Sequence, residues 1–270
     1  MDVYDAVSGF YRRYRGEKRI FGKSAEGRDL YAFFIGAHDA PLGICQYAVH
    51  AREWITSMLA LEHVRRGIVR GGAWILPLVN PDGAVLATRG VDAVSPARRE
   101  TLLALNGGED FSLWKANAEG VDLNVNFPAR WGTGSKNVRV PAPENYIGKF
   151  PLCAPESRAL ADFTREVRPD FTVSWHTKGE EIYWRFFQRG ERLRRDLRLA
   201  KILSRATGYP LAEAPRSAGG YKDWCVEKLK IPAFTVEAGS DLFSHPLGFS
   251  ALPDLFEKNL DALVRFTEEY

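Results

Sequence analysis

LGICQYAVHAREWITSMLALEHVRRGIVR, residues 42–70, joins a strand pattern to a helix pattern through a short turn. Its first part, 42–49, is almost continuously apolar, which is typical of a strand covered on both faces. Its last part, 54–70, has apolar residues at helical spacing. The turn between them carries His50 and Glu53. Because ligands of open α/β sheets bind outside the carboxyl ends of the strands, this turn is a candidate functional site. Glu53 could equally serve only the electrostatics of the helix N-terminus.

The rest of the chain repeats this alternation of strand and helix patterns. Further strand patterns lie at 29–36, 73–79, 171–175, 181–186 and 232–238, and further helix patterns at 155–167, 192–207, 221–230 and 252–270. This order predicts an α/β fold in which a mixed, mostly parallel central sheet has helices on both faces. No repeat or low-complexity linker divides the sequence, so residues 1–270 are predicted to form a single domain. From 84 to 150 the sequence is rich in Gly, Asn, Pro and Arg with weak periodicity, and such a length of irregular chain usually builds a functional site.

Composition and charge exclude several classes of function. The 270 residues are 45% hydrophobic and 26% charged, which is an ordinary globular composition, and they suffice for a large core. The net charge of +3 gives no electrostatic basis for nucleic acid as the main partner. The basic runs at 65–70 and 189–198 follow helix patterns and are interpreted as solvated helix faces.

The sequence carries no membrane or secretion signal. No apolar run approaches the ~18 residues that span a bilayer, and the first residues lack the apolar core and cleavage pattern of a signal peptide. Cys45, Cys153 and Cys225 are far apart and not spaced as metal ligands, which is typical of reduced thiols. A cytoplasmic protein without a membrane partner is therefore expected, and a leader removed from the sequence stays open as the alternative.

Two further strand patterns end on residues that suit metal catalysis. The run SWHTKG brings His176, and the run TVEAGSD brings Glu237, to or near the carboxyl end of a strand. With His50 and Glu53, His176 completes two imidazoles and one carboxylate, the ligand set of a catalytic zinc site. Glu237 suits the role of general base beside it. Each residue alone has an ordinary alternative, a hydrogen-bonded histidine or a salt-bridged glutamate, but the three strand ends together predict a metallohydrolase.

Several motifs resemble those of the zinc carboxypeptidases. HAREWI (50–55) is similar to that family's HxxE motif, NPDG (80–83) to the turn after its next strand, and GVDLNVNF (120–127) to its GVDLNRNF segment. GKSAEGRDL (22–30) and PESRAL (155–160) extend the resemblance over most of the chain.

The resemblance implies the chemical roles of individual residues. It implies one Zn²⁺ per chain, bound by His50, Glu53 and His176. It also implies that Glu237 is the catalytic acid/base. Trp114-Lys115 stands where the family usually has Trp-Arg, so Lys115 would stabilise the tetrahedral oxyanion, as a point charge without the guanidinium fork. Asn124 matches the Asn that helps to hold a substrate carboxylate.

Two positions depart from the family pattern. Val125 stands where carboxypeptidases carry the Arg that clamps a C-terminal carboxylate, and valine cannot donate a hydrogen bond. Val226 falls where digestive members have a mobile Tyr, which leaves Tyr221 or Tyr183 as substitutes. WKANAEGVDLNVNFPARW, HTKGEEIYWRF and GYPLAEAPRSAGGYKDW resemble bacterial gamma-D-glutamyl-meso-diaminopimelate peptidases. The resemblance thus implies a metalloprotease of bacterial cell-wall peptidoglycan, with a small murein stem peptide as its partner.

Other amide substrates stay open, and so do the oligomeric state and the residues that bind substrate. A peptidase or deacylase of the same fold could act on an ordinary C-terminal residue or an N-acyl amino acid, whereas a non-catalytic binding module is disfavoured because the ligands and the base are all present. The substrate-binding candidates, some of which could equally be surface charges, are Asn124, Val125, Arg130, Lys178, Arg185 and Tyr221, with Glu180 and Glu181 for the far end of diaminopimelate. His38, His63 and His245 are expected to be structural or exposed.

Overall fold

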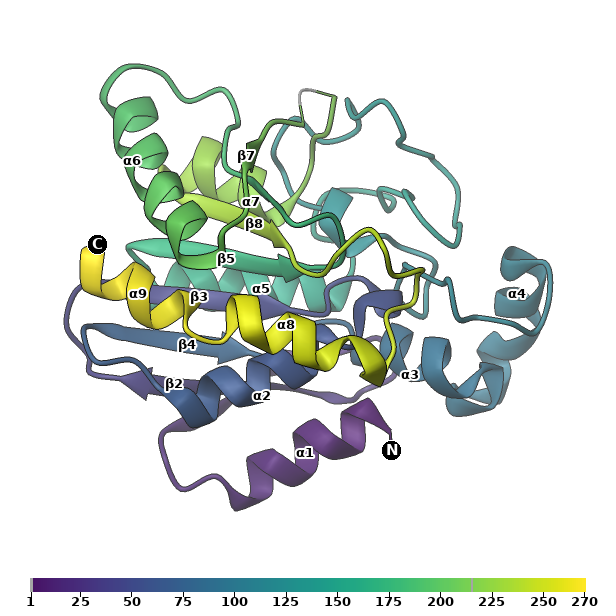
Figure 1. Cartoon of the computed structure of the whole chain (residues 1–270). Coiled ribbons are helices and arrows are strands. Elements are labelled where there is room, and N and C mark those ends of the chain that lie inside the picture. Colours follow the sequence, from purple (N-terminus) through teal and green to yellow (C-terminus); the bar gives the residue numbers. More distant parts are fainter. Residues whose placement is uncertain (1, 215) are drawn as a thin grey trace.

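The strands form one mixed sheet. The computed structural model describes residues 2–214 and 216–270, and within them eight strands are hydrogen-bonded in the order β1-β2-β4-β3-β5-β8-β6-β7 (Figure 1). Their bounds are β1 (Lys18–Lys23), β2 (Asp29–Gly36), β3 (Leu42–Tyr47), β4 (Gly72–Leu76), β5 (Phe171–His176), β6 (Glu181–Tyr183), β7 (Leu211–Ala212) and β8 (Ala233–Glu237). Four of the seven strand pairings are parallel, including the central run β4-β3-β5-β8. The predicted α/β fold with a mixed, mostly parallel sheet is confirmed.

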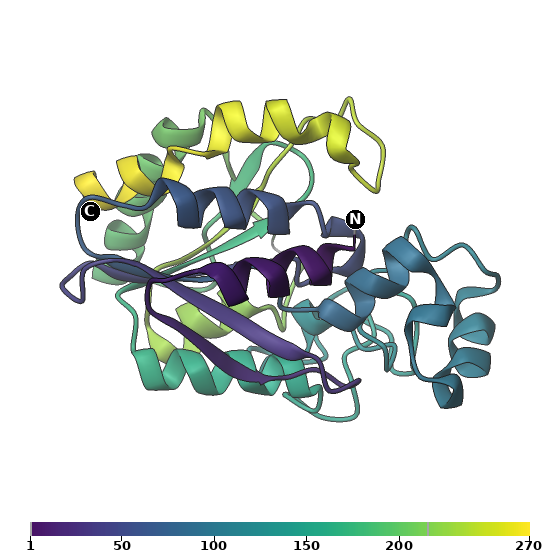
Figure 2. The same ribbon diagram turned by 90° about the horizontal axis from the view of Figure 1, so that it is seen from below.

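Helices cover both faces of this sheet. The helices are α1 (Val3–Arg13), α2 (Thr56–Arg66), α3 (Pro81–Arg89), α4 (Pro96–Asn106), α5 (Pro155–Val167), α6 (Gly190–Thr207), α7 (Tyr221–Trp224), α8 (Leu252–Asn259) and α9 (Ala262–Glu269). Figure 2 shows α2, α6, α8 and α9 on one side of the sheet and α5 on the other. The core is split accordingly, because residues of α2, α6, α8 and α9 form one buried cluster with the sheet and residues of α5 and α7 form a second.

The side chains of α5 illustrate why the sequence forms these layers. A proline at the first helical position fits there without losing a hydrogen bond, and Pro155 occupies it. Leu160, Ala161 and Phe163 are buried against the sheet, whereas Arg165 faces solvent and pairs with Asp162. Burial of this apolar stripe is the main source of stability for such a helix.

The parallel centre of the sheet brings the predicted functional residues to one edge. His50 follows β3, His176 ends β5 and Glu237 ends β8. The register pairs Tyr47 with Trp175 and His176 with Glu237 across neighbouring strands. The rings of Tyr47 and Trp175 are buried and stack with centroids 5.9 Å apart, so the last residue of β3 contacts the residue that precedes His176 on β5.

Some sequence-based bounds were wrong. The region 84–150, expected to be irregular, contains the end of α3 and all of α4, and its irregular part begins after residue 106. The helix expected over 252–270 is divided into α8 and α9. β1 lies at the edge of the sheet and its side chains are half-buried or exposed, so it lacks the apolar run by which the inner strands were predicted.

In the part of the chain that the structure describes, none of the helices combines the length and the apolar character required to cross a membrane.

Candidate active site

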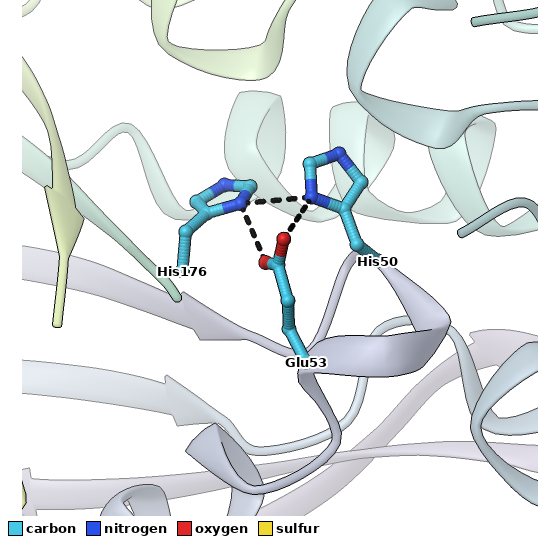
Figure 3. A group of neighbouring side chains, drawn as sticks. All are labelled: His50, Glu53 and His176. Atoms are coloured by element: carbon cyan, nitrogen blue, oxygen red, sulfur yellow. Dashed lines mark hydrogen bonds and ion pairs between the residues drawn. The ribbon is translucent and has the colours of Figure 1, made fainter. Parts of the chain in front are cut away.

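Three side chains converge at the carboxyl edge of the central strands (Figure 3). Nδ1 of His50 lies 2.8 Å from one carboxylate oxygen of Glu53, and Nδ1 of His176 lies 2.9 Å from the other. The two Nδ1 atoms are 3.1 Å apart. All three side chains are buried, so two imidazoles and a carboxylate share one point from which bulk water is largely excluded.

The local backbone explains how His50 and Glu53 reach this point together. After β3 the chain makes a single turn of 3₁₀ helix, Ala51–Glu53, which rotates the two side chains onto one side. The hydroxyl of Thr56 holds this turn, because it donates to the Glu53 carbonyl at 2.9 Å and accepts from the Ala48 N–H at 2.9 Å. Ala48 has φ of 48°, a left-handed conformation that costs energy for a residue with a Cβ and is found preferentially at functional sites.

The electrostatics of the cluster keep Glu53 ionised. Burial by itself would raise the pKa of Glu53, but His50 and His176 outweigh it and hold the pKa well below its usual range. A carboxylate that stays ionised beside two imidazole nitrogens can bind a cation together with them.

Asp122 and Lys115 form a buried pair behind His50. Nζ of Lys115 lies 3.1 Å from one Asp122 oxygen, and the other Asp122 oxygen lies 3.4 Å from Nε2 of His50. Burial alone would raise the pKa of Asp122, but Lys115 and His50 outweigh it and hold the pKa well below its usual range. Carboxylates that contact the second nitrogen of a ligating histidine fix its ring orientation. Asp122 is therefore a positioning residue that the sequence analysis missed, although it stands inside the GVDLNVNF motif.

Glu237 differs from these carboxylates because its side chain has no ion pair or hydrogen bond among the described residues. It borders the same cavity as His50 and Lys115. Burial raises the pKa of Glu237 to about 7. The negative charges of the nearby Glu53 and Glu181 act in the same direction, whereas His176 and Lys115 lower this pKa. A carboxyl group with such a pKa can both take up and release a proton near neutral pH.

A cavity of about 480 Å³ opens beside these residues. The predicted residues that line it are His50, Lys115, Asn124, Val125 and Glu237. Tyr183 also lines it, from β6, where it is paired in register with Thr235. The structure thus brings together the predicted catalytic pair, one metal ligand and two of the substrate-binding candidates.

The structure places the remaining substrate-binding candidates elsewhere. Tyr221 is fully buried and its hydroxyl lies 2.8 Å from that of Thr164, so it belongs to the core and Tyr183 is the tyrosine that faces the cavity. The three predicted cations are not among the lining residues, and each pairs with a carboxylate: Arg130 with Glu227, Lys178 with Asp241 and Arg185 with Glu213. Glu180 pairs with Lys258, and Glu181 accepts a hydrogen bond from Tyr183.

Four charged residues that line the cavity were not predicted. Lys136 and Arg216 are exposed, and Lys222 and Asp223 lie at the start of α7. Their sequence signal was weak, because Lys222 and Asp223 follow the apolar Tyr221 in an ordinary amphipathic pattern. Only the three-dimensional approach of α7 to β8 reveals that they border the same space as Glu237.

The other shared motifs have structural roles. Asn80 caps α3 by accepting from the Gly83 N–H at 3.0 Å, and its amide donates to the carbonyls of Val49 and Ala116 at 3.2 and 3.1 Å. Asp82 accepts from Ser24 and pairs with Arg28 at 2.7 Å, which attaches the GKSAEGRDL turn to α3. His63, predicted to be structural or exposed, is buried between Tyr47 and the Asn259 carbonyl.

The donor set fits a zinc ion. One ligand atom from each of His50, Glu53 and His176 lies within 4.8 Å of the other two. Nδ1 of each imidazole points to the shared centre, while Nε2 of His50 faces Asp122 at 3.4 Å and Nε2 of His176 is buried without a hydrogen-bond partner among the described residues. Two neutral imidazoles and one carboxylate are the usual protein ligands of catalytic zinc.

The fold and this site together define a class of protein. An α/β sheet whose strand ends present a two-histidine, one-carboxylate cation site and an unpaired carboxylate beside a cavity is the architecture of a metal-dependent hydrolase. The particular family follows from the sequence. Residues 15–259 match the family model described as zinc carboxypeptidase, and the chain belongs to this family. The predicted family is confirmed, and with it the predicted enzyme class, a metallopeptidase-type hydrolase.

Individual relatives are similar over most of the chain. A relative from Lysinibacillus sphaericus, "Gamma-D-glutamyl-L-diamino acid endopeptidase 1", is 36% identical over 233 residues, which are 78% of this chain and 57% of the relative. The chain therefore spans a little over half the length of that protein. Bovine thrombin-activatable fibrinolysis inhibitor has the same fold, with a TM-score of 0.80 and 21% identity over 99% of this chain and 95% of that one. The murein-tripeptide amidase MpaA from Escherichia coli O157 shares it with a TM-score of 0.62 and 23% identity over 93% and 92% of the two chains.

Proposed function

We propose that this protein is a zinc-dependent peptidase that hydrolyses the bond between D-glutamate, through its γ-carboxyl, and meso-diaminopimelate in peptidoglycan stem peptides. One zinc ion per chain is held by His50, Glu53 and His176. The partner is a small murein stem peptide, and the expected location is the cytoplasm.

The roles of the residues follow from their positions. A zinc ion bound by the three ligands supplies Lewis acidity and makes water a stronger acid. Glu237 takes the proton from the attacking water and passes it to the leaving amine, for which a pKa of about 7 is suited. Lys115 opposes the negative charge that develops on the carbonyl oxygen. Asp122 holds both Lys115 and the ring of His50 in place.

One observation carries the choice of substrate. The cavity beside Glu237 has Val125 at the position of the carboxylate clamp, yet it is lined by the cations Lys136, Arg216 and Lys222. Such a cavity favours a substrate with a negative charge away from the position of the missing clamp. Diaminopimelate has that character, because it carries a second amino-acid group at the end of its side chain. The printed name of the Lysinibacillus relative, a gamma-D-glutamyl-L-diamino acid endopeptidase, supports the same bond.

A second candidate is a peptidase of the same fold that removes an ordinary C-terminal residue. Asn124 favours it, since this residue lines the cavity and its family counterpart helps to hold a substrate carboxylate. Without a guanidinium at position 125, however, a bidentate contact to that carboxylate is lost.

The test is to incubate the zinc-loaded protein with muramyl tripeptide and tetrapeptide and to identify the released fragments by mass. Release of diaminopimelate, or of its dipeptide with D-alanine, is the expected result. Cleavage between L-alanine and D-glutamate would refute the proposed bond, and hydrolysis of neither peptide would refute the substrate class.

A further inference from the structure

Asn117 lies inside the turn that joins Lys115 to Asp122, two residues of the candidate active site. The side chains of Lys115 and Asp122 meet at the site, with Nζ 3.1 Å from a carboxylate oxygen. Asn117 is fully buried, and its side-chain oxygen accepts hydrogen bonds from the backbone N–H groups of Glu119 and Val121 at 2.9 and 3.0 Å. One side-chain oxygen thus holds the backbone of the turn between its two functional ends.

The backbone of Asn117 is held in the same turn. Its N–H donates to the Val121 carbonyl at 2.9 Å, and its carbonyl accepts from the Gly120 N–H at 3.1 Å and from the indole N–H of Trp114 at 3.2 Å. The Trp114 side chain is fully buried, and this residue immediately precedes Lys115. A displacement of Asn117 therefore moves both ends of the turn.

The side-chain amide of Asn117 also ties the turn to another element. Its Nδ2 donates at 3.0 Å to Oε2 of Glu156, in the first turn of α5. Glu156 is fully buried, and its other carboxylate oxygen accepts from the Ala25 N–H at 2.9 Å. Neither Asn117 nor Glu156 lines the cavity. Since buried polar groups are costly unless they are hydrogen-bonded, the two side chains depend on each other, and their contact determines where the turn sits relative to α5.

We propose that the hydrogen bond between Asn117 and Glu156 positions the turn for catalysis: it keeps Lys115 where the carbonyl oxygen gains negative charge and keeps Asp122 against the ring of His50. Asn117 and Glu156 are positioning residues, because they act through Lys115 and Asp122 and not on the substrate. This rests on the proposed function, which gives Lys115 its charge-stabilising role. A displacement of about 1 Å can lower turnover ~10²-fold, so weakening this hydrogen bond should lower kcat and leave KM nearly unchanged.

The experiment exchanges the donor and the acceptor of this hydrogen bond. Asn117→Asp removes the donor and faces the Glu156 carboxylate with a second negative charge, so kcat should fall at least ~10-fold while KM and zinc content stay near the wild-type values. Glu156→Gln should lower kcat less, because the introduced amide oxygen can still accept from Asn117. The double variant restores the hydrogen bond in the opposite direction and should recover kcat to within ~3-fold of the wild type.

Steady-state rates are measured on muramyl tripeptide at about pH 8. Burial raises the pKa of Glu156 to about 7, so under these conditions its carboxyl group is mostly ionised and has no proton to donate to the carboxylate introduced by Asn117→Asp.

Asn259→Ala is the matched control. Asn259 is also fully buried, and its amide donates to the Tyr209 hydroxyl at 3.0 Å and to the Leu255 carbonyl at 2.8 Å. It ends α8 and does not line the cavity. This variant should lower the melting temperature and leave kcat unchanged.

Two results would overturn the positioning role and leave the peptidase in place. One is a double variant that is no more active than Asn117→Asp alone. The other is an Asn117→Asp variant that keeps the wild-type kcat, or whose loss lies in KM or zinc content instead. If Asn117→Asp does not fold, which thermal melting reveals, Asn117→Ser takes its place, since serine keeps an acceptor for the turn but is too short to reach Glu156. A wild-type kcat in Asn117→Ser would then overturn the proposal.

Failure of the proposed function gives a different result. If zinc-loaded wild-type protein cleaves neither stem peptide, the substrate class is refuted, and a crystal structure of Asn117→Asp decides the positioning role. A Lys115 Nζ displaced from its 3.1 Å contact with Asp122 would support that role, whereas an unchanged contact would overturn it.

Discussion

At the scale of single residues, the three carboxylates of the candidate site differ in the partners of their side chains. Glu53 is held between two imidazoles, and Asp122 between Lys115 and His50, so both stay ionised. Glu237 borders the cavity without such a partner among the residues described, and burial raises its pKa to about 7. A held carboxylate suits a ligand or a positioning role, whereas a free one with a raised pKa suits proton transfer.

The first prediction concerns the metal. Protein purified without added metal should contain about one zinc per chain, because the donor set matches the ligand preference of Zn²⁺. Elemental analysis measures this. The double variant with His50→Ala and His176→Ala should lose the metal, whereas His38→Ala should keep it, since His38 is exposed and pairs with Glu17. Stoichiometric zinc in the double variant would place the site elsewhere.

The second prediction concerns the base. Glu237→Gln should keep the fold and the zinc but lose turnover by ~10² to 10⁴-fold, because the amide preserves shape and removes basicity. Glu166→Gln is a suitable control, because Glu166 is exposed, pairs with Arg19 and is not among the residues that line the cavity. Steady-state rates on the stem peptide decide the matter, and a near-normal kcat for Glu237→Gln would assign the proton transfer to another group.

The third prediction concerns the missing clamp. The protein should be poor at removing C-terminal residues from ordinary L-peptides, since Val125 cannot hold their carboxylate. Val125→Arg should increase kcat/KM on a hippuryl-amino-acid substrate by at least ~10-fold, because a charge-assisted hydrogen bond is worth about 1.5–3 kcal/mol. A spectrophotometric assay of hippuryl hydrolysis tests both statements, and efficient hydrolysis by the wild-type protein would contradict the first.

At the scale of elements, the candidate active site depends on how two segments of the chain are held together. The turn after β3 carries His50 and Glu53, and the segment that carries Lys115 approaches it from the other side, with the Ala51 N–H donating to the Lys115 carbonyl at 3.1 Å. Asn80, at the start of α3, hydrogen-bonds carbonyls of both segments. The buried side-chain amide of Asn80 thus holds the turn with His50 and Glu53 and the segment with Lys115 together.

Asn80→Ala should therefore weaken both stability and metal binding. It removes three buried hydrogen bonds and leaves two carbonyls and one N–H without partners, which should cost roughly 2–4 kcal/mol of unfolding free energy. Asn106→Ala, at the solvent-exposed end of α4, should cost less than about 1 kcal/mol. Urea denaturation and zinc titration measure the two effects, and equal losses for both variants would remove the special role of Asn80.

The same elements show which features the sequence could predict. The inner strands and the positions of His50, His176 and Glu237 were predictable, because an apolar run buried on both faces must end at a polar turn and these three residues stand at or near those ends. β1 was missed because an edge strand needs no apolar run. Tyr221 was wrongly placed in the substrate site and Lys222 was missed, because a helix as short as α7 does not reveal from its pattern which residue faces the core and which faces the cavity.

At the scale of the whole molecule, two buried groups make stability depend on pH in opposite directions. Burial lowers the pKa of His63 to about 4, and its ring lies between the Tyr47 hydroxyl and the Asn259 carbonyl. Burial, followed by the nearby Asp82, raises the pKa of Glu156 to about 7. Glu156 also accepts from the Ala25 N–H and the Asn117 amide.

The signs follow from the proton counts. Between pH of about 6.5 and 4 the unfolded chain binds a proton at His63 that the folded chain does not, so His63 makes stability fall as the pH falls, by roughly 3 kcal/mol in total. Glu156 keeps its proton in the folded chain up to about pH 7, so its contribution is complete below about pH 4.3 and is lost as the pH rises. Because the two pH windows overlap, the two contributions largely cancel in the wild type between about pH 4.5 and 6.5. Urea denaturation over this range should show that the stability of His63→Gln falls as the pH rises and that the stability of Glu156→Gln increases as the pH rises. Slopes that match the wild type in both variants would contradict the assignment.

Because the central strands are parallel, their carboxyl ends lie together on one side of the molecule, the front, and their amino ends lie on the opposite side, the back. Tyr270 donates a hydrogen bond to the carbonyl of Asp170, just before β5 begins, whereas His176 stands where β5 ends. The six residues of β5 place these two points about 20 Å apart on opposite edges of the sheet (Figure 1). A resin, a fluorophore or a fusion partner coupled through Tyr270 would therefore attach at the back, and an immobilised layer of the protein would present its cavities to the passing solution.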